Sequence, residues 1–343
     1  MTDRMACISA FLARAGWSDA TIAPLAGDAS NRRYLRLTDG PGGQGAVLMD
    51  APPERGEDVR PFIRIAQHLA GLGLSAPAII AQDTDAGLLL LEDLGDAIFA
   101  RVLETSPELE NGLYSSATDL LAALHDHPLP QPIAAYDPPM MTTLAALAFD
   151  WYRLGTAGDA GAVLKEQFCA VLEPLLTRHA AAADVLILRD YHAENLLWLP
   201  ERTGLTRIGL LDFQDALAGH RAYDLVSLLQ DARRDVPDSI ESAMLERYIA
   251  ATGQDAESFV TAYRLLGAQR KLRILGVFAR LCLRDGKPRY LDLIPRVWAH
   301  LQRDLEHPVL APLRPILADA LPAPTPSNLA RLKDQCAIIP TLS

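Results

Sequence analysis

Three side chains in the middle of the chain have the types and spacing of a metal-assisted active site: Asp190, Asn195 and Asp212. All three offer oxygen atoms as ligands. Hard cations such as Mg²⁺ prefer oxygen ligands, and Mg²⁺ is commonly held by one or two carboxylates together with substrate phosphates. The set therefore suggests a site at which Mg²⁺ bridges protein and phosphate, provided that the fold brings the three side chains together.

A predicted β-hairpin would bring these side chains together. Two apolar runs, residues 196–199 and 208–211, flank a short segment with a glycine, and this pattern predicts two antiparallel strands joined by a turn. Pairing residue 196 with residue 211 sets Asn195 opposite Asp212 and carries both to the same end of the hairpin. Asp190 lies in the loop that enters the hairpin.

The composition argues against several classes of partner. The chain has 343 residues, with 32 Lys and Arg against 43 Asp and Glu, and a formal net charge of −11. An acidic balance argues against nucleic acid, because binding to phosphate backbones requires a basic surface. No apolar run is long enough to span a bilayer, and the first residues do not resemble a signal peptide. The four scattered cysteines indicate free thiols in a reducing compartment. We expect a cytoplasmic protein with no nucleic-acid or membrane partner, and we take it to be a monomer.

The N-terminal part is predicted to be rich in β-structure. Apolar periodicity predicts a first helix over residues 3–16 and a second over residues 58–71. Short apolar runs bounded by turn residues predict four strands, which are expected at residues 33–37, 46–49, 78–81 and 87–91. These elements describe a small antiparallel sheet with one inserted helix.

After residue 93 helices dominate. The helical period predicts them at residues 108–125, 142–154, 161–180, 223–234, 238–252, 256–283 and 288–304. A proline-rich connection over residues 128–139 is predicted to be a loop, because proline lacks a backbone donor. The fold class is therefore α+β, with a sheet-rich N-terminal lobe at residues 1–93 and a mainly helical C-terminal lobe at residues 94–343.

The segment around the three side chains resembles that of a known family. Arg-Asp-Tyr-His-Ala-Glu-Asn-Leu-Leu at 189–197 and Leu-Asp-Phe-Gln-Asp-Ala at 211–216 look like motifs of the aminoglycoside phosphotransferase family, which is similar in fold to choline kinases and protein kinases. The resemblance implies a protein-kinase-like bilobal fold, with ATP bound by the N-terminal lobe and catalysis and substrate binding in the C-terminal lobe. It implies Asp190 as the base that accepts the proton of the attacking hydroxyl, and Asn195 and Asp212 as Mg²⁺ ligands.

Segments of the N-terminal part narrow the resemblance to one branch. Gly-Asp-Ala-Ser-Asn-Arg-Arg-Tyr at 27–34, Val-Leu-Met-Asp-Ala-Pro-Pro at 47–53 and Leu-Leu-Glu-Asp-Leu-Gly-Asp at 90–96 resemble the anomeric N-acetylmuramate/N-acetylglucosamine kinases of bacterial cell-wall recycling. The similarity covers most of residues 20–235. It implies ATP-dependent phosphorylation of the C1 hydroxyl of an amino sugar.

Two of these segments could contact ATP, one at its phosphates and the other at its adenine. Gly27, Ser30 and Asn31 belong to a small-residue turn before a strand, which can lay backbone N–H groups over phosphates; a plain hairpin turn is equally compatible. The stretch from Glu92 to Leu94 would join the lobes and offer backbone hydrogen bonds to adenine. The alternative there is a strand that simply ends in a polar loop.

The sequence departs from the kinase pattern at Met49, which stands where the family has a lysine that contacts the α- and β-phosphates. The four lysines of the chain are Lys165, Lys271, Lys287 and Lys333, so none precedes residue 165. Either an arginine replaces the lysine, with Arg32, Arg33 and Arg60 as candidates, or the protein is a nucleotide-binding pseudokinase. Arg32 and Arg33 are adjacent on a strand and face opposite ways, so only one can point to the phosphates.

Residues for the acceptor are suggested by the resemblance to this fold. Trp151 and Arg153 lie on a helix of the C-terminal lobe; the indole could stack on a sugar and the guanidinium could pair with the lactyl carboxylate of N-acetylmuramate. Both also suit a helix that buries its aromatics. His192 could contact substrate or bond to its own loop. Asp224 matches an aspartate that ties the catalytic loop to the following helix, or serves as the N-cap of that helix. An aminoglycoside or aminoalcohol kinase is the alternative enzyme, and it would surround its cationic substrate with carboxylates.

Overall fold

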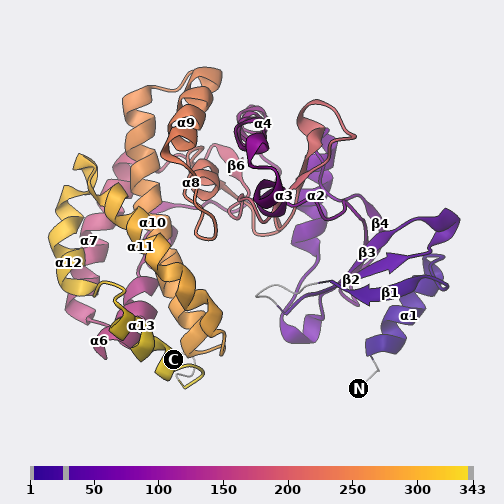
Figure 1. The fold of residues 1–343 in the computed structure, drawn as a ribbon, viewed down its shortest axis with the longest axis horizontal. Helices are drawn as coiled ribbons and strands as arrows, with labels where there is room; N and C mark the ends of the chain where they lie inside the picture. The colour runs from indigo at the N-terminus through magenta and orange to yellow at the C-terminus, as the bar shows by residue number, and fades with distance from the viewer. Residues whose placement is uncertain (1–3, 26–30, 339–343) are drawn as a thin grey trace. The chain divides into compact units, whose positions relative to one another are not determined.

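The computed structural model describes residues 4–25 and 31–338, and the chain divides into two compact units (Figure 1). The first unit comprises residues 1–120 and 193–216, and the second comprises residues 121–192 and 217–343. This division differs from the boundary expected after residue 93. The later hairpin is bonded to the N-terminal part of the chain, since the Leu210 N–H donates to the Ser75 carbonyl and the Trp198 N–H donates to the Ala97 carbonyl.

The first unit contains a five-stranded antiparallel sheet in the order β1-β2-β3-β5-β4. The strands are β1 (Thr21–Pro24), β2 (Arg33–Thr38), β3 (Ala46–Asp50), β4 (Ile79–Asp83) and β5 (Leu88–Glu92). Four of them were expected from the sequence. The fifth, β1, was missed because it is short and exposed throughout, so it has no alternation of apolar and polar residues to signal it.

Helix α1 (Arg4–Arg14) covers one face of this sheet. Its Phe11 and Leu12 pack in a buried apolar cluster with residues of β2, β3 and β5, including Leu37, Leu48 and Leu90. Successive residues of a strand point to opposite faces, so the residues next to these in the sequence lie on the other face of the sheet. That other face is the one that carries the candidate site.

Three further helices belong to the first stretch of the first unit, residues 1–120, or begin within it. Helix α2 (Arg60–Gly71) was expected, and it buries an apolar stripe that includes Phe62 and Ile65. Helix α3 (Phe99–Thr105) was not expected, because seven residues are too few to display a helical period. Helix α4 (Glu110–Leu124) leads the chain into the second unit.

The predicted hairpin is present, but its register differs by one residue from the prediction. Strands β7 (Leu196–Trp198) and β8 (Ile208–Leu210) pair with Leu196 opposite Leu210, and the Leu211 N–H donates to the Asn195 carbonyl. Asp212 therefore lies one residue beyond the pair rather than opposite Asn195. The sequence could not fix the register, because apolar residues fill both runs and allow either alignment.

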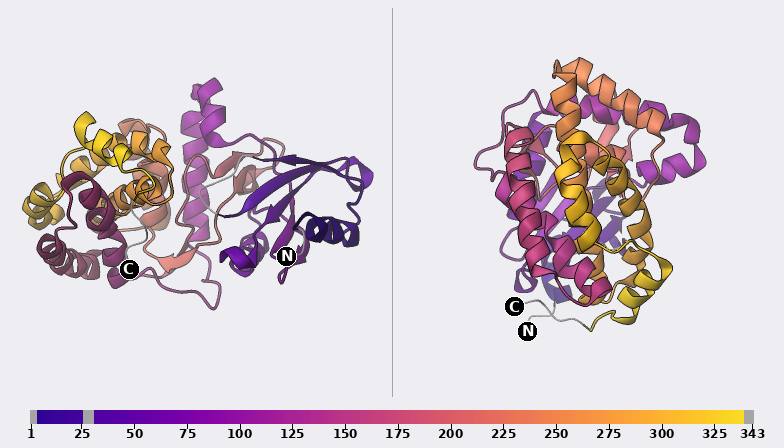
Figure 2. Two further views of the ribbon diagram at one scale, coloured as in Figure 1. Left: turned by 90° about the horizontal axis from the view of Figure 1, so that it is seen from below. Right: turned by 90° about the vertical axis from the view of Figure 1, so that its left-hand side faces the viewer.

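The second unit is mainly helical, and the long helix α10 (Ala256–Leu283) packs against α11, α5, α7 and α8 (Figure 2). Its helices are α5 (Pro138–Ala145), α6 (Leu154–Ala157), α7 (Ala162–His179), α8 (Tyr223–Leu229), α9 (Asp238–Thr252), α10, α11 (Ile294–Leu305), α12 (Arg314–Ala320) and α13 (Pro326–Asp334). Strands β6 (Val185–Ile187) and β9 (Leu217–Gly219) pair within the same unit. No helix in the described part of the chain is both long and apolar enough to cross a membrane.

Several helix boundaries differ from those predicted. Helix α5 begins at Pro138, inside the segment expected to be a loop, because Asp137 caps it and proline is compatible with the first helical turn. The helix expected over 142–154 is interrupted by a wider π-type turn at Ala148–Arg153. Helix α8 ends at Leu229, five residues before the predicted end. Helices α9 and α10 have the predicted bounds.

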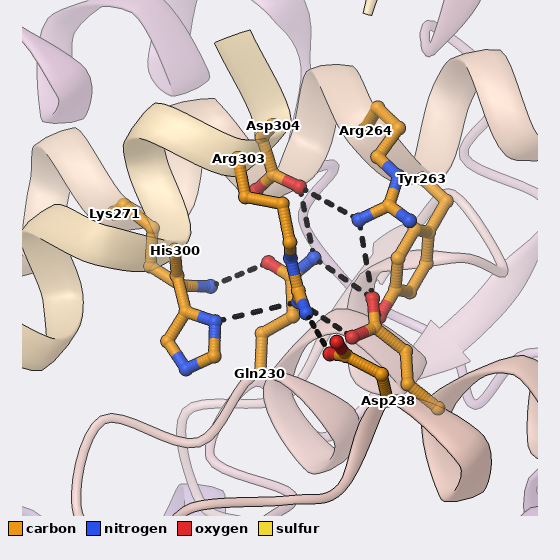
Figure 3. A network of polar contacts seen from close by, with 9 residues as sticks. Gln230, Asp238, Tyr263, Arg264, Lys271, His300, Arg303 and Asp304 are labelled. Carbon is orange, nitrogen blue, oxygen red and sulfur yellow. Dashed lines mark hydrogen bonds and ion pairs between the residues drawn. The ribbon is translucent and has the colours of Figure 1, made fainter. Parts of the chain in front are cut away.

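A buried polar network lies inside the second unit (Figure 3), and we call its residues the buried network. Gln230 is at its centre: its amide nitrogen donates to the Asp304 carboxylate at 2.9 Å and its carbonyl oxygen accepts from Lys271 at 2.9 Å. Arg264 donates to the carboxylates of both Asp304 and Glu241. The other members are Tyr263, Asp238, His300 and Arg303.

Candidate active site

The end of the β7–β8 hairpin opens onto a cavity in the first unit. Asn195 and Asp212 both line this cavity, which has a volume of about 300 Å³. Asp212 has a backbone φ of 55°. A left-handed conformation turns the chain out of the strand, so Asp212 reaches the cavity although it lies two residues beyond the end of β8. The one-residue change in register therefore leaves Asn195 and Asp212 in the same cavity.

Neighbouring side chains hold the Asp212 segment in place. The Gln214 amide donates to the Asp212 carboxylate at 2.7 Å. Phe213 is fully buried, and its ring stacks on that of Phe62 in α2, with 4.8 Å between centroids. The Leu210 N–H donates to the Ser75 carbonyl at 2.9 Å. These contacts fix the hairpin to α2 and to the segment between α2 and β4, so the two oxygen-bearing side chains have a rigid support.

The expected hinge residues line the same cavity. The walls include Val47 of β3 and Leu91 of β5, with Glu92 and Leu94 at the end of β5. The Glu92 carboxylate accepts from the Ala78 N–H at 3.2 Å and from Arg202 at 2.5 Å, so its side chain is engaged by the protein. Any contact to a ligand from this segment would therefore come from the backbone. Apolar walls suit a flat heterocycle.

The two arginine candidates at the start of β2 have different partners: Arg33 is the first residue of the strand, and Arg32 immediately precedes it. Arg33 and Arg4 both form ion pairs with the buried Asp50 carboxylate, on the strand face that α1 covers. Arg32 pairs with Glu57 at 2.8 Å. Burial lowers the pKa of Arg32, but the Glu57 hydrogen bond and the charges of Tyr34, Glu57 and Asp212 raise it overall. Arg32 therefore lies close enough to Asp212 for the charge of that carboxylate to raise the pKa of the guanidinium.

Arg60 and Arg36 are two further arginines to compare as possible replacements for the lysine. Arg60 is 66% exposed and pairs with Asp58 and Asp85, and it does not line the cavity. Arg36 was not considered from the sequence, yet it lines the cavity and pairs with Asp93 and Asp96. Of the small-residue turn, Gly27 and Ser30 lie outside the described residues. Asn31 donates its backbone N–H to Glu57 at 3.1 Å.

Met49 is 1% exposed on β3, opposite Tyr34 of β2 and Leu89 of β5. Helix α2 has no acidic residue between Arg60 and Gly71. Glu57 precedes α2 and pairs with Arg32. The Arg32–Glu57 ion pair thus joins the segment before β2 to the segment before α2.

Asp190 belongs to the second unit, in the loop through which the chain returns to the first. Its carboxylate lies 3.6 Å from the guanidinium of Arg270, and its side chain is 31% exposed. Burial alone raises the pKa of Asp190, but the charges of Arg270, Arg273, His192 and Arg189 lower it to about 2. We call Asp190, Tyr223, Arg270 and Arg273 the base cluster. At neutral pH the carboxylate is ionised and can accept a proton.

Asp224 holds the backbone of this loop. Its carboxylate accepts from the Leu188 N–H at 2.6 Å and from the Arg189 N–H at 2.9 Å. It makes no capping bond to its own helix, which begins at Tyr223. Burial raises the pKa of Asp224 to about 7, although the two N–H donors oppose that change. Arg189 has a backbone φ of 70°, and Asp224 holds that uncommon conformation just before Asp190.

The three residues suggested for the acceptor are engaged inside the second unit. Trp151 is 4% exposed. Arg153 pairs with Asp159 at 3.1 Å and donates to the Ala320 carbonyl at 2.6 Å. His192 is buried, with its Nε2 atom 3.3 Å from Arg233. Burial lowers the pKa of His192 to about 4, and Arg233 contributes in the same direction.

The donor set in the cavity fits Mg²⁺. No group of three or more His, Cys, Asp or Glu side chains in the described part of the chain forms a closed metal site. Two protein oxygens at the wall of an open cavity are what Mg²⁺ requires when phosphate and water supply the remaining ligands. Asn195 and Asp212 are the residues that would hold it.

Glu57, Arg36, Arg270 and Arg273 were not expected from the sequence to lie near these groups. Glu57 and Arg36 had no motif to mark them. Arg270 and Arg273 had a signal, since two arginines three residues apart share one face of a predicted helix. That signal gave no reason to connect them with Asp190, eighty residues earlier in the sequence.

Comparison with known proteins adds independent findings. Residues 21–263 match the model of the phosphotransferase enzyme family, abbreviated APH. An N-acetylmuramate/N-acetylglucosamine kinase from Caulobacter vibrioides is 40% identical, and the alignment covers 91% of this chain and 95% of that protein. A protein of the same name from Pseudomonas aeruginosa is 36% identical, with 91% and 93% covered.

Solved structures show the fold. An aminoglycoside 2'-phosphotransferase superposes with a TM-score of 0.61 at 14% identity, covering 90% of this chain and all of the other. An ethanolamine kinase from Plasmodium vivax superposes with a TM-score of 0.56 at 15% identity, covering 85% and 83%. The predicted fold class, α+β with a protein-kinase-like arrangement, is confirmed by these similarities.

Proposed function

The chain belongs to the phosphotransferase enzyme family, and from this premise we propose that it transfers the γ-phosphoryl group of ATP to the C1 hydroxyl of N-acetylmuramate or N-acetylglucosamine. The observation that carries the proposal is the cavity that Asn195 and Asp212 share with the expected hinge. The similarity over nine-tenths of the chain to kinases of that name supports the choice of acceptor. The protein would act in the cytoplasm as a monomer in the recycling of cell-wall sugars.

The reaction needs little covalent chemistry from the protein. The C1 oxygen forms a bond to the γ-phosphorus while the bond from that phosphorus to the β,γ-bridging oxygen breaks, and ADP leaves with the electron pair. The proton of the C1 hydroxyl passes to the Asp190 carboxylate. A carboxylate with a pKa of about 2 is a weak base, which suffices because a loose transition state develops little positive charge on the hydroxyl.

Asn195 and Asp212 would hold Mg²⁺, which when bound neutralises charge on the β- and γ-phosphates. Arg32 would take the place of the missing lysine, with Glu57 orienting it. A guanidinium binds phosphate oxygens in pairs, so the exchange of lysine for arginine preserves the charge and adds a second hydrogen bond.

The charges near Asp190 disfavour the alternative acceptors. An aminoglycoside or an aminoalcohol is cationic and requires carboxylates around the reacting hydroxyl. The charged side chains that act most strongly on Asp190 are Arg270 and Arg273. Such a setting repels a cation and suits a neutral or acidic sugar.

Purified protein with ATP and Mg²⁺ should convert N-acetylmuramate and N-acetylglucosamine to 1-phosphates, detected by ³¹P NMR as an anomeric phosphate. Kanamycin, choline and ethanolamine serve as controls and should remain unmodified. Turnover of the cationic compounds alone would overturn the choice of acceptor. ATP binding without turnover of any acceptor would favour the pseudokinase reading.

The assignment of Arg32 can be tested against its neighbour. Arg32→Ala should raise the KM for ATP about tenfold or more, because a charge-assisted hydrogen bond to phosphate is lost. Arg33→Ala should leave that KM nearly unchanged, since Arg33 pairs with Asp50 on the α1 face. Equal effects of the two substitutions on the KM for ATP would refute the assignment.

A further inference from the structure

Two arginines one turn apart on α10 reach the same tyrosine hydroxyl in the base cluster. Arg270 Nη1 lies 3.2 Å and Arg273 Nη1 lies 3.1 Å from the hydroxyl oxygen of Tyr223. Tyr223 is fully buried, so its oxygen is a fixed point for both guanidinium groups. The two cations differ in what else they contact.

Arg270 is almost completely engaged by the protein. It donates to the Arg189 carbonyl at 2.9 Å and to the Ser227 hydroxyl at 2.7 Å, and it lies 3.6 Å from Asp190. Its side chain is 6% exposed. These bonds join α10 to the loop that carries the base, so Arg270 positions that loop.

Arg273 is engaged much less. Its hydrogen bond to Tyr223 is the one that the structure gives it, and across residues 4–25 and 31–338 no carboxylate lies within 4 Å of its guanidinium. The residue is only half-buried. Its charge nevertheless lowers the pKa of Asp190, second only to Arg270 among the charged neighbours. A guanidinium close to the base thus keeps most of its N–H donors for something other than the protein.

We propose that Arg273 binds the carboxylate of an acidic acceptor and so selects N-acetylmuramate over N-acetylglucosamine. This inference rests on the proposed function. The reacting hydroxyl is on C1 and the lactyl ether is on C3 of the same ring, so a hydroxyl at Asp190 brings the carboxylate to the immediate surroundings of the base. N-acetylglucosamine has no carboxylate and cannot make this contact.

Arg153 is less suited to the same role. Its guanidinium already contacts the Asp159 carboxylate and the Ala320 carbonyl, and its side chain is 14% exposed. Binding of a substrate carboxylate would have to break that ion pair. Arg273 needs no such exchange, and Tyr223 holds its guanidinium in a defined direction, which reduces the entropy lost on binding.

The experiment compares kcat/KM for the two sugars in the wild-type protein and in Arg273→Gln, Arg273→Lys and Arg280→Gln. Arg280 lies two turns further along α10 and serves as the matched control. A pH of 8 keeps Asp190 ionised in every variant. The methyl ester of N-acetylmuramate is a third substrate, since it has the shape of the acid without its charge.

Arg273→Gln should lower kcat/KM for N-acetylmuramate by about 10- to 100-fold, mainly through KM, because a hydrogen-bonded ion pair is lost. The value for N-acetylglucosamine should change far less, which also shows that the variant is folded. Arg273→Lys should restore part of the loss. The wild-type protein should prefer the acid to its ester, and Arg273→Gln should lose that preference.

An equal fall for both sugars in Arg273→Gln would overturn the inference, because it would place the guanidinium on the transferred phosphate or in the fold. Unchanged kinetics for both sugars would overturn it as well. If the wild-type protein phosphorylates neither sugar, the proposed function fails and the inference falls with it. These outcomes are distinguishable, since the first two require an active wild-type enzyme.

Discussion

Helix α10 carries two polar clusters that use the same residue types and differ in their balance of charge. In the buried network (Figure 3), the cations Arg264, Lys271 and Arg303 lie among carboxylates from Asp304, Glu241 and Asp238. On the neighbouring face of the same helix, Arg270 lies near Asp190, and Arg273 has no carboxylate within 4 Å in the described part of the chain.

The difference separates a structural cluster from a functional one. A buried charge is tolerated when opposite charges and hydrogen bonds satisfy it, and the buried network does this with its own side chains. Burial still disfavours the charged form of a lysine in this network, since it lowers the pKa of Lys271 to about 7. The base cluster instead leaves positive charge next to a partly exposed carboxylate, which is the pattern expected of a site completed by its ligand.

The largest effect is expected from the carboxylate of the base cluster. Asp190→Asn should lower kcat by about 10²- to 10⁴-fold, because it removes the proton acceptor. The Kd for ATP should change little. Steady-state kinetics with N-acetylmuramate and calorimetric titration with ATP would measure the two quantities.

Asp238→Asn is the control, because Asp238 is an exposed member of the buried network. Its kcat should equal that of the wild-type protein. A near-normal rate in Asp190→Asn would show that Asp190 is not the base. The base cluster would then have no catalytic role to distinguish it from the buried network.

The next effect concerns stability. Asp304 is fully buried and contacts Gln230 and Arg264, so Asp304→Asn leaves buried positive charge without its partner. We expect the free energy of unfolding to fall by about 3 to 5 kcal/mol. Asp238→Asn removes an 86% exposed partner of Arg303 and should cost about 1 kcal/mol or less. Urea unfolding at pH 8 would compare them, and equal losses would contradict the division between buried and exposed partners.

The smallest effect is a change in pH dependence. The pKa of Asp190 is about 2 because the charges of Arg270, Arg273, His192 and Arg189 together outweigh burial, which by itself raises it; Arg270 makes the largest of these four contributions. Arg270→Met should therefore raise the pKa of the base by about one to three pH units. Catalysis needs the ionised carboxylate, so kcat should begin to fall as the pH drops toward 5 in the variant. It should stay level over the same range in the wild-type protein.

Arg280→Gln keeps both clusters intact and should follow the wild-type profile. Because Arg270 also bonds to the loop, Arg270→Met should lower kcat at every pH, and only the pH dependence reports on the base. A variant whose kcat is lower but equally level from pH 8 to pH 5 would show that Arg270 acts on Asp190 through position alone.

Much of the fold was determined by local signals in the sequence. The period of apolar residues located α1 and α2, because each is an amphipathic helix that buries one apolar stripe. The length of the helical segments also made α9 and α10 recognisable. The short elements β1 and α3 were not predicted, because a few residues cannot display a period. The types of Asp190, Asn195 and Asp212, and the absence of lysine before residue 165, were also plain from the sequence.

Tertiary structure decided which of these residues meet which partners. Strand alternation required Arg32 and Arg33 to diverge, but only the position of α1 and Asp50 assigned Arg33 to the face away from the cavity. The hairpin register was decided by pairing across the strands and not by composition. Arg273 approaches Asp190 from a helix more than eighty residues later, and no local pattern encodes a contact over that separation. The sequence by itself therefore supplied the chemical groups, while packing selected the charges that surround them.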